Sequence, residues 1–334
     1  MKIIGRAVVS SVVLASTVSA VEYSVGSCAD LQAVDETALT SLIVTSSPIE
    51  CEDYLRFVVR NDMTLSATVP EVVLSNIALK IKGGLTVEIE PDIVFKDVFE
   101  VVKNGGALSI SEECTVTFMG TAQFIDNSVL IKQLEPVTCG EGCTRTARGL
   151  SYVVKKGGAI HNKGELTFQG DASFLGCYSQ TDDSVAMSRG GAISNTAPGV
   201  IYFMGDLTME KSEAEGFFEG QGGAIYNRGD IVVDGDAAFY DNDAADGGAI
   251  YQEKWGTFEI NGMANFTQND AFEAFGGAIC NQGGVVNLNG GSVFHGNVAT
   301  CSGECGSGGA IYNIDGGVVT CVVAQVGNIS ATQA

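Results

Sequence analysis

The sequence predicts an all-β protein: a right-handed, single-stranded parallel β-helix with a small cap at its N-terminal end. Three observations support this fold class. Gly-Gly-Ala-Ile, or Gly-Gly-Ala-Leu in one copy, occurs seven times, and a second motif related to Phe-x-x-Asn follows each of the first six copies. The 334 residues include 43 glycines and only 5 prolines, which favours many tight, repeated turns over a disordered linker.

The two motifs divide the chain into units of nearly constant length. The first motif begins at Gly105, Gly157, Gly190, Gly222, Gly247, Gly276 and Gly308. Each of the first six units advances 20 to 22 positions from its first glycine to the end of the second motif, whereas the segment that follows varies from 4 to 29 residues. A repeat that keeps its strands and varies one connection is a coil whose insertions all leave from one corner.

Each unit predicts three short strands that cannot bury an apolar face alone. Stacking successive units about 4.8 Å apart in parallel register gives these faces a shared core. The repeated phenylalanines are then expected to form an internal ladder, and the asparagines five residues after each first glycine are expected to bond the backbone at a turn. The predicted ladder residues are Phe124, Phe174, Phe239, Phe266 and Phe294, with Asn162, Asn195, Asn227, Asn281 and Asn313.

The chain divides into a signal peptide over residues 1–20, an N-terminal cap over 21–54 and the β-helix over 55–334, with motif-bearing coils at 105–313. Lys2 and Arg6, a short apolar run and a small-residue cleavage site at Ala20 are typical of a secretory signal. Residues 28–43 have a spacing that favours helix and are expected to cover the open first coil. We therefore expect a secreted, extracellular protein whose mature chain has no transmembrane segment.

All ten cysteines follow the predicted signal, and an even number in an exported chain suggests disulfides. Cys280 and Cys321 stand in apolar runs and are expected to be small core residues. Neither of the glycine-rich loops that hold a cysteine pair contains a histidine, which argues against zinc. The disulfide candidates are Cys28 and Cys51, which flank the predicted cap and would tie it down, and the loop pairs Cys139 with Cys143 and Cys301 with Cys305, between which an exchange of partners stays open.

The charge balance limits the partners. Cleavage after Ala20 leaves 16 basic and 40 acidic residues, a net charge of −24, which excludes nucleic acid and anionic membranes as partners of a broad basic face. The longest variable connection, residues 128–156, is nevertheless basic. It either pairs with the acidic coils or reaches an acidic partner: an extracellular glycan, a surface protein or a second copy. Its basic residues, the predicted contact residues, are Lys132, Arg145, Arg148, Lys155 and Lys156.

The alternation of the two motifs resembles the repeats of the chlamydial polymorphic outer-membrane proteins, within the pectin-lyase-like superfamily of right-handed β-helices. The resemblance covers residues 105–313. It implies a β-helical domain displayed outside the cell, often with an adhesive role. The family's C-terminal membrane β-barrel is not expected here, because no alternating lipid-facing segments follow the last motif.

The same superfamily includes pectate lyases and polygalacturonases, so a polysaccharide-active lyase or hydrolase is the alternative function. Such chemistry needs clustered carboxylates with a basic residue or histidine. The two histidines, His161 and His295, occupy repeat positions that other copies fill with unrelated residues. Asp182-Asp183 lies in a variable segment, and the aspartates between 234 and 246 lack a calcium-repeat spacing. We therefore expect no catalytic residues, cofactor or metal, and a structural or adhesive role.

Overall fold

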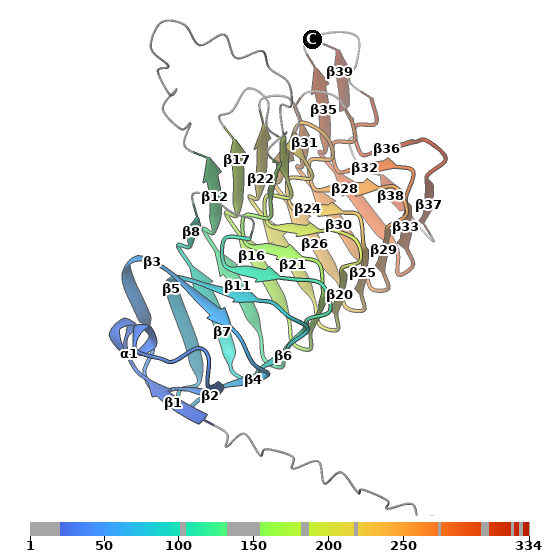
Figure 1. Ribbon diagram of the computed structural model, residues 1–334. Helices are drawn as coiled ribbons and strands as arrows, with labels where there is room; N and C mark the ends of the chain where they lie inside the picture. Colours follow the sequence, from blue (N-terminus) through green and yellow to red (C-terminus); the bar gives the residue numbers. More distant parts are fainter. Residues whose placement is uncertain are drawn as a thin grey trace, which may run out of the picture.

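The computed structural model describes residues 21–100, 105–131, 154–181, 187–216, 220–272, 275–301, 307–321, 324–326 and 330–333. Almost every element is a strand, and every strand pairing among these residues is parallel. The strands stack coil upon coil from the first residues described to the last (Figure 1). The parallel β-helix predicted from the motifs is therefore confirmed.

The apolar segment between the two motifs forms one face of the coil, an eleven-stranded sheet. Its side chains alternate between the core and solvent; in β25, Ile231 and Val233 are buried and Asp230 is exposed. The strands are β1 (Val21–Val25), β2 (Leu39–Val44), β4 (Met63–Ala67), β6 (Thr86–Ile89), β10 (Thr115–Phe118), β15 (Glu165–Phe168), β20 (Val200–Phe203), β25 (Asp230–Val233), β29 (Thr257–Ile260), β33 (Val285–Leu288) and β37 (Val318–Cys321).

The two motifs themselves build a seventeen-stranded sheet in two series that share the long strands β3 (Ile49–Val59) and β5 (Glu71–Ile81). The glycine motif leads into β9 (Leu108–Ile110), β14 (Ile160–Asn162), β19 (Ile193–Asn195), β24 (Ile225–Asn227), β28 (Ile250–Glu253), β32 (Ile279–Gln282) and β36 (Ile311–Ile314). The phenylalanine series is β7 (Asp92–Lys96), β11 (Ala122–Ile125), β16 (Ala172–Leu175), β21 (Leu207–Glu210), β26 (Ala237–Tyr240), β30 (Ala264–Thr267), β34 (Ser292–His295) and β38 (Ala324–Val326).

Short strands also follow the second motif, where the sequence predicted only loop. Their repeated apolar residue is only an alanine, and Ala214, Ala244, Ala271 and Ala299 stand in register and fully buried on successive coils. The prediction of three strands per unit was therefore incomplete. One sheet of eight comprises β8 (Phe99–Glu100), β12 (Ser128–Ile131), β17 (Tyr178–Thr181), β22 (Glu213–Gly216), β27 (Asp243–Ala244), β31 (Asp270–Ala271), β35 (Val298–Cys301) and β39 (Ser330–Gln333). A sheet of three comprises β13 (Val154–Lys156), β18 (Met187–Arg189) and β23 (Gly220–Gln221).

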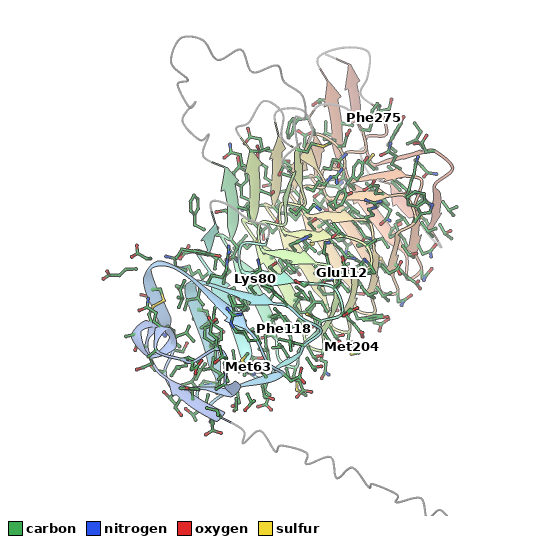
Figure 2. All side chains as sticks on the ribbon, in the orientation of Figure 1. Met63, Lys80, Glu112, Phe118, Met204 and Phe275 are labelled. Carbon is green, nitrogen blue, oxygen red and sulfur yellow. A yellow bond between two sulfur atoms is a disulfide. The ribbon has the colours of Figure 1, made fainter. Side chains whose placement is uncertain are left out.

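The phenylalanines of the second motif lie in the core in stacked rows. The ring centroids of Phe239 and Phe266 are 4.8 Å apart, and those of Phe266 and Phe294 are 4.9 Å apart. Phe124 and Phe174 stack at 4.7 Å, and Met209 pairs in register between Phe174 and Phe239. A second row, Phe118, Phe168 and Phe203, stacks on the eleven-stranded sheet at 4.9 and 4.8 Å. The motifs did not single out this second row, because its residues lie outside them; Figure 2 labels Phe118.

The asparagines of the first motif form a hydrogen-bonded row at a buried turn. Each side-chain amide donates to the next asparagine or glutamine along the solenoid: Asn162 to Asn195 at 2.9 Å, Asn195 to Asn227 at 2.9 Å and Asn227 to Gln252 at 2.8 Å. The other described asparagine pair of this position, Asn281 and Asn313, is joined at 2.9 Å. The asparagines of the second motif form a similar row, in which Asn242, Asn269 and Asn297 are linked at 2.9 Å and fully buried.

The N-terminal region is mostly strand. Helix α1 (Cys28–Gln32) is short, and the hydroxyl of Ser27 caps it by accepting from the amide of Asp30. The expectation of helix over residues 28–43 is wrong beyond Gln32, because Leu39, Leu42 and Val44 face the core in β2, which pairs with β1 and β4. A disulfide joins Cys28 to Cys51, with Cα atoms 5.3 Å apart, and so ties α1 to β3 as the cysteine count allowed.

Candidate functional site

The residues that flank each Gly-Gly-Ala-Ile motif form two columns of side chains on the outside of the solenoid. We call the residue before the first glycine the leading position and the residue after the isoleucine the trailing position, and we call the two columns together the corner face. The leading column is Lys156, Arg189, Gln221, Asp246, Phe275 and Ser307. The trailing column is His161, Ser194, Tyr226, Tyr251, Cys280 and Tyr312.

Strand alternation places the trailing column outside the core. In β24, Ile225 belongs to the main hydrophobic core and Asn227 bonds the inner turn, whereas Tyr226 between them packs in a separate cluster with Tyr251 and Cys280. The repeated motif therefore holds one outward side chain per coil in a fixed place. That side chain is free to differ from coil to coil without disturbing the core.

The two columns contact each other across the glycines. The guanidinium carbon of Arg189 lies 4.6 Å from the ring centroid of Tyr226, one coil further on. The rings of Phe275 and Tyr312, related in the same way, stack with centroids 4.3 Å apart. The two glycines between the columns have no side chains, so in these two pairs a long leading side chain reaches the trailing residue of the next coil.

One end of the corner face is crowded with positive charge. Burial lowers the pKa of the Lys156 ammonium group, and the charges of Arg189, Lys163 and Arg228 lower it further; Glu253 opposes them weakly. We call these four cations the basic end. Like charges that depress one another's ionisation create a local positive potential, here on a chain whose formal net charge is −22.

His161 forms the floor of the basic end. It is buried, and its Nδ1 lies 3.3 Å from the backbone oxygen of Ser194. Burial, followed by the charge of Lys156, lowers the pKa of His161 to about 4, so the imidazole is neutral at pH 7. His295 lies on β34 in the other strand series and is exposed. The structure therefore does not bring the two histidines together.

The other end of the corner face is aromatic. The rings of Tyr226 and Tyr251 stack with centroids 5.9 Å apart. Each tyrosine hydroxyl donates to a side chain on the next coil, that of Tyr226 to Glu253 and that of Tyr251 to Gln282. These bonds hold the two rings in place as a packed layer, because Tyr226 is fully buried and Tyr251 is buried too. The aromatic side chains of this end that are partly exposed are Phe275 and Tyr312.

The structure brings only part of the predicted basic connection to this face. Lys156 belongs to the basic end, and Lys155 precedes it in β13. Lys132, Arg145 and Arg148 lie outside the described residues, as do Cys139, Cys143 and Cys305. Cys301 ends strand β35, and Cys321 is a half-buried free thiol beside the core. The expectation that Cys280 is a small buried residue outside any disulfide is confirmed, and its free thiol packs in a separate hydrophobic cluster with Tyr226 and Tyr251.

The asparagine row is part of the scaffold beneath this face, and Asn227 tests that role. Its amide donates to the backbone oxygen of Thr257 at 2.9 Å, and its carbonyl oxygen accepts from the backbone amide of Gly229 at 3.2 Å. Asn227→Ala is expected to lower the free energy of unfolding by about 2–3 kcal/mol, because buried backbone groups lose their partners. Urea denaturation measures this, with the exposed Asn265→Ala as control. An unchanged midpoint for Asn227→Ala would contradict a scaffold role.

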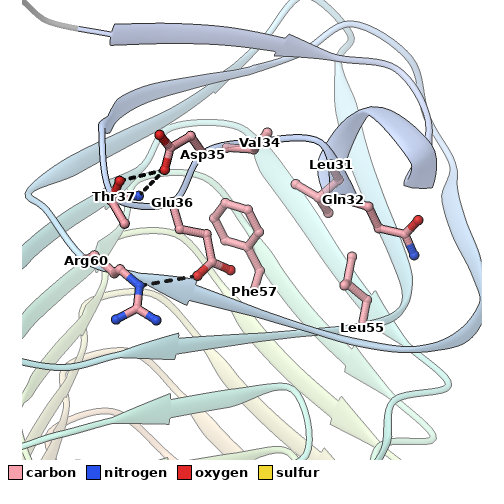
Figure 3. A pocket seen from close by; sticks show the side chains of 9 residues that line it. All are labelled: Leu31, Gln32, Val34, Asp35, Glu36, Thr37, Leu55, Phe57 and Arg60. Atoms are coloured by element: carbon pink, nitrogen blue, oxygen red, sulfur yellow. Dashed lines mark hydrogen bonds and ion pairs between the residues drawn. The ribbon is translucent and has the colours of Figure 1, made fainter.

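A cleft of about 370 Å³ lies where α1 meets the first coils (Figure 3). Its polar side chains bond to the protein itself. Glu36 accepts from the backbone amide of Val58 and lies 3.5 Å from the Arg60 guanidinium, and Asp35 accepts from the hydroxyl of Thr37. These bonds join the cap region to β3. We therefore assign this cleft to the closure of the first coil.

Acidic side chains gather on the eight-stranded sheet. Glu213, Asp243 and Asp270 stand in register on successive coils. Burial, followed by the charges of Asp270 and Glu213, raises the pKa of Asp243 to about 6. In the described part of the chain, no group of three or more histidine, cysteine, aspartate or glutamate side chains is arranged to hold a metal ion.

A signal in the sequence could have revealed the corner face. The motif itself repeats almost without change, whereas its leading residue changes from basic in two copies to amide, acidic, aromatic and hydroxyl in the next four. A position whose side chain changes in chemical type beside an unchanging motif is not constrained by packing in the core. Which leading residue touches which trailing residue depends on the coil register, which the sequence alone does not supply.

The chain is similar to "Probable outer membrane protein pmp7" of Chlamydia pneumoniae, with 30% identity over 149 residues, which is 40% of this chain and 16% of that protein. The chain thus spans about a sixth of that relative's length. No family model matches the chain, and no solved structure matches it. Among the residues described, no helix has the length and apolar character needed to cross a membrane.

Proposed function

We propose that this chain is a secreted, non-enzymatic adhesive protein that presents its corner face, together with the neighbouring variable connections, to an extracellular partner. The observation that supports this most strongly is the arrangement of that face. An invariant motif holds chemically different side chains at regular spacing, as a binding surface requires. The similarity to an outer-membrane protein agrees with a surface role.

The secreted location rests on two further observations. The first 20 residues have the composition of a signal peptide. The Cys28–Cys51 disulfide belongs to oxidising compartments, which include the extracellular space and the bacterial periplasm. Recovery of the chain from culture medium with its N-terminus at Val21 and this disulfide intact would support the proposal.

The basic end of the corner face favours an acidic partner. The side chains of Lys156 and Arg189 are neighbours in register, and the first variable connection, which the sequence shows to be basic, leads directly into Lys156. Attraction at such a site acts over about 10 Å at moderate salt and weakens as salt rises. The acidic remainder of the chain repels other anionic surfaces and so restricts contact to this end.

Charge reversal tests the role of the basic end. The double variant Lys156→Glu/Arg189→Glu is expected to elute from immobilised heparin at lower salt than the native chain and to lose at least about tenfold in affinity for acidic partners found on a glycan and surface-protein array. Lys96→Glu/Lys211→Glu introduces the same charge change at two exposed lysines paired with neighbouring acids, and it should behave almost as the native chain does. Lys132→Glu/Arg145→Glu/Arg148→Glu extends the test to the connection itself.

Two results would count against this proposal. Equal heparin retention of the native chain and the Lys156→Glu/Arg189→Glu variant would remove the basic end as a contact. Degradation of a uronate polymer, seen as unsaturated-product absorbance or new reducing ends, would replace adhesion by the alternative polysaccharide lyase or hydrolase activity. Melting temperatures of the two double variants should stay close to that of the native chain, because Lys156, Arg189, Lys96 and Lys211 lie outside the main core.

A further inference from the structure

One turn of the solenoid exposes the single tryptophan of the chain. Trp255 lies in the turn at residues 253–256, which joins β28 to β29 (Figure 1). It is 84% exposed, whereas Met204, the next most exposed large apolar residue in the described part of the chain, is 54% exposed. Tryptophan side chains are highly buried on average, because they carry a large apolar area. Trp255 therefore contributes little to the packing of the coils.

The backbone at Trp255 is strained. The backbone amide of Gly256 closes the turn by donating to the oxygen of Glu253 at 3.4 Å, and Trp255, the third residue of the turn, has φ +68°. A bulky residue rarely adopts this left-handed conformation, and glycine is the usual residue where a turn requires it. Two coils further on, Gly316 holds the equivalent position with φ +77°. The fold itself therefore favours glycine at position 255.

Exposure and strain at one residue together indicate a contact residue. A side chain that buries little apolar area and holds the backbone in a costly conformation is not accounted for by the stability of the fold. Strained residues of this kind cluster at ligand-binding positions. Tryptophan is also among the residues that contribute most to binding at contact surfaces. Both observations therefore indicate that Trp255 serves a contact outside the solenoid.

The surroundings of Trp255 are polar. No other apolar side chain stands in its own turn or in the equivalent turn of the next coil, residues 282–284. The stem of Lys254 crosses Gly283, where an added Cβ would lie 2.8 Å from Lys254 Cγ. The Lys254 Nζ lies 3.7 Å from the carboxylate of Asp315, and both side chains are exposed. Trp255 is therefore a single aromatic face with charged hydrogen-bonding groups close to it along the solenoid.

A sugar ring fits these surroundings best. A protein contact centred on a tryptophan is normally ringed by further side chains that exclude water, and a membrane contact needs an apolar face of several residues. A pyranose ring whose substituents are equatorial has an apolar C–H face and a rim of hydroxyl groups. One aromatic face with a few polar groups beside it suits such a ring. The acidic chain, with a formal net charge of −22, further favours a neutral glycan over an anionic one at this turn.

We propose that Trp255 is the stacking platform for a pyranose ring of a neutral, β-linked glycan. The indole covers the C–H face of one ring, and the exposed side chains of Lys254 and Asp315 bond its hydroxyl groups. The glycan continues over the following coils, because a Cβ at Gly316 would meet nothing within 4 Å. This inference rests on the proposed adhesive role and adds to the basic end a second contact surface, which takes an uncharged ligand.

The single tryptophan makes binding directly measurable by fluorescence. The probes are cellohexaose and chitohexaose, two neutral β-linked oligosaccharides, titrated into the full chain. A saturable blue shift of the emission and weaker quenching by acrylamide are expected, because a stacked sugar ring removes water from the indole. Unchanged emission with both oligosaccharides would overturn the proposal. A shift with phosphatidylcholine vesicles in place of the oligosaccharides would assign Trp255 to a membrane contact and would overturn it too.

Substitutions at Trp255 separate a contact role from a role in the fold. In Trp255→Gly the relief of strain outweighs the added freedom of the unfolded chain, so the melting temperature should stay the same or rise. Its affinity for the oligosaccharides, measured by calorimetry, should fall at least about tenfold. Trp255→Phe keeps an aromatic face and should bind more tightly than Trp255→Gly. Met204→Ala removes the next most exposed apolar side chain and should bind as the native chain does. Undiminished binding by Trp255→Gly, or a clear fall in its melting temperature, would contradict the proposal.

The platform at Trp255 and the basic end can be tested separately. The Lys156→Glu/Arg189→Glu variant should bind cellohexaose and chitohexaose as the native chain does, and Trp255→Gly should keep the native retention on heparin. Lost oligosaccharide binding in the charge-reversal variant would contradict a separate site at Trp255. Failure of the heparin test together with intact oligosaccharide binding would remove the basic end as a contact and support the platform alone.

Discussion

Phe266→Ala is expected to lower the free energy of unfolding by about 3–5 kcal/mol, the usual cost of deleting a fully buried phenylalanine. Phe266 is fully buried, and its ring stacks between Phe239 at 4.8 Å and Phe294 at 4.9 Å. Both neighbours are held by strands paired in register, so they cannot collapse into the cavity without pulling adjacent coils out of alignment. Urea denaturation followed by circular dichroism measures the loss.

Tyr240→Ala is the matched control for Phe266→Ala. Tyr240 is an aromatic residue of the neighbouring strand β26, but its side chain is exposed, so its removal should change stability by roughly 0.5 kcal/mol. A loss as small as that for Phe266→Ala would mean that the ring contributes little, and the internal ladder would have to be abandoned as a source of stability. Because each coil contacts only its neighbours, the loss should appear first in the coils around β30.

Gly223→Ala is expected to cost about 3 kcal/mol or more, although it adds a single methyl group. A Cβ at this second glycine of the motif would lie 2.1 Å from the backbone oxygen of Gly248 and 2.6 Å from backbone atoms of Asp243. Gly248 lies on the next coil, and Asp243 lies in β27, which is paired on both sides with β22 and β31. Neither backbone can move away alone, so relief requires the coils to separate. The melting temperature and the urea midpoint should both fall.

The variant Gly316→Ala distinguishes the cost of steric overlap between coils from the cost of backbone strain alone. Gly316 has φ +77°, which costs an L-residue about 1–2 kcal/mol, but a Cβ there meets nothing within 4 Å. Gly223→Ala should therefore cost clearly more than Gly316→Ala even though the backbone at Gly223 has no positive φ. The opposite order would show that the motif needs its second glycine for conformation and that coil contact is secondary.

The residues whose roles depend on periodicity were predictable. Phe239, Phe266 and Phe294 recur at a nearly constant distance from the glycine motif, 17 to 19 residues after its first glycine, and that spacing implies that they share a row. The same logic applies to Asn162, Asn195 and Asn227. The row of Phe118, Phe168 and Phe203 escaped notice because these residues end a segment that is otherwise Val, Ile or Leu in other coils.

The N-terminal region shows the opposite case. Residues 28–43 lack the motif, so their local spacing was the available guide, and it favoured helix. Strand β1 offers a pairing partner from the residues just after the predicted signal, and β4 offers another, so Leu39–Val44 is extended between them. Strand pairing of this kind overrides the helix propensity of a short segment, and the pairing partners cannot be identified from the local sequence.

By itself the sequence determined the solenoid, its rows of phenylalanine and asparagine and the corner at which its connections vary, because all of these follow from a period along the chain. Only the tertiary structure decided how the two columns of the corner face meet. Arg189 and Tyr226 are 37 positions apart, and so are Phe275 and Tyr312, and each pair meets only because one coil lies on the next.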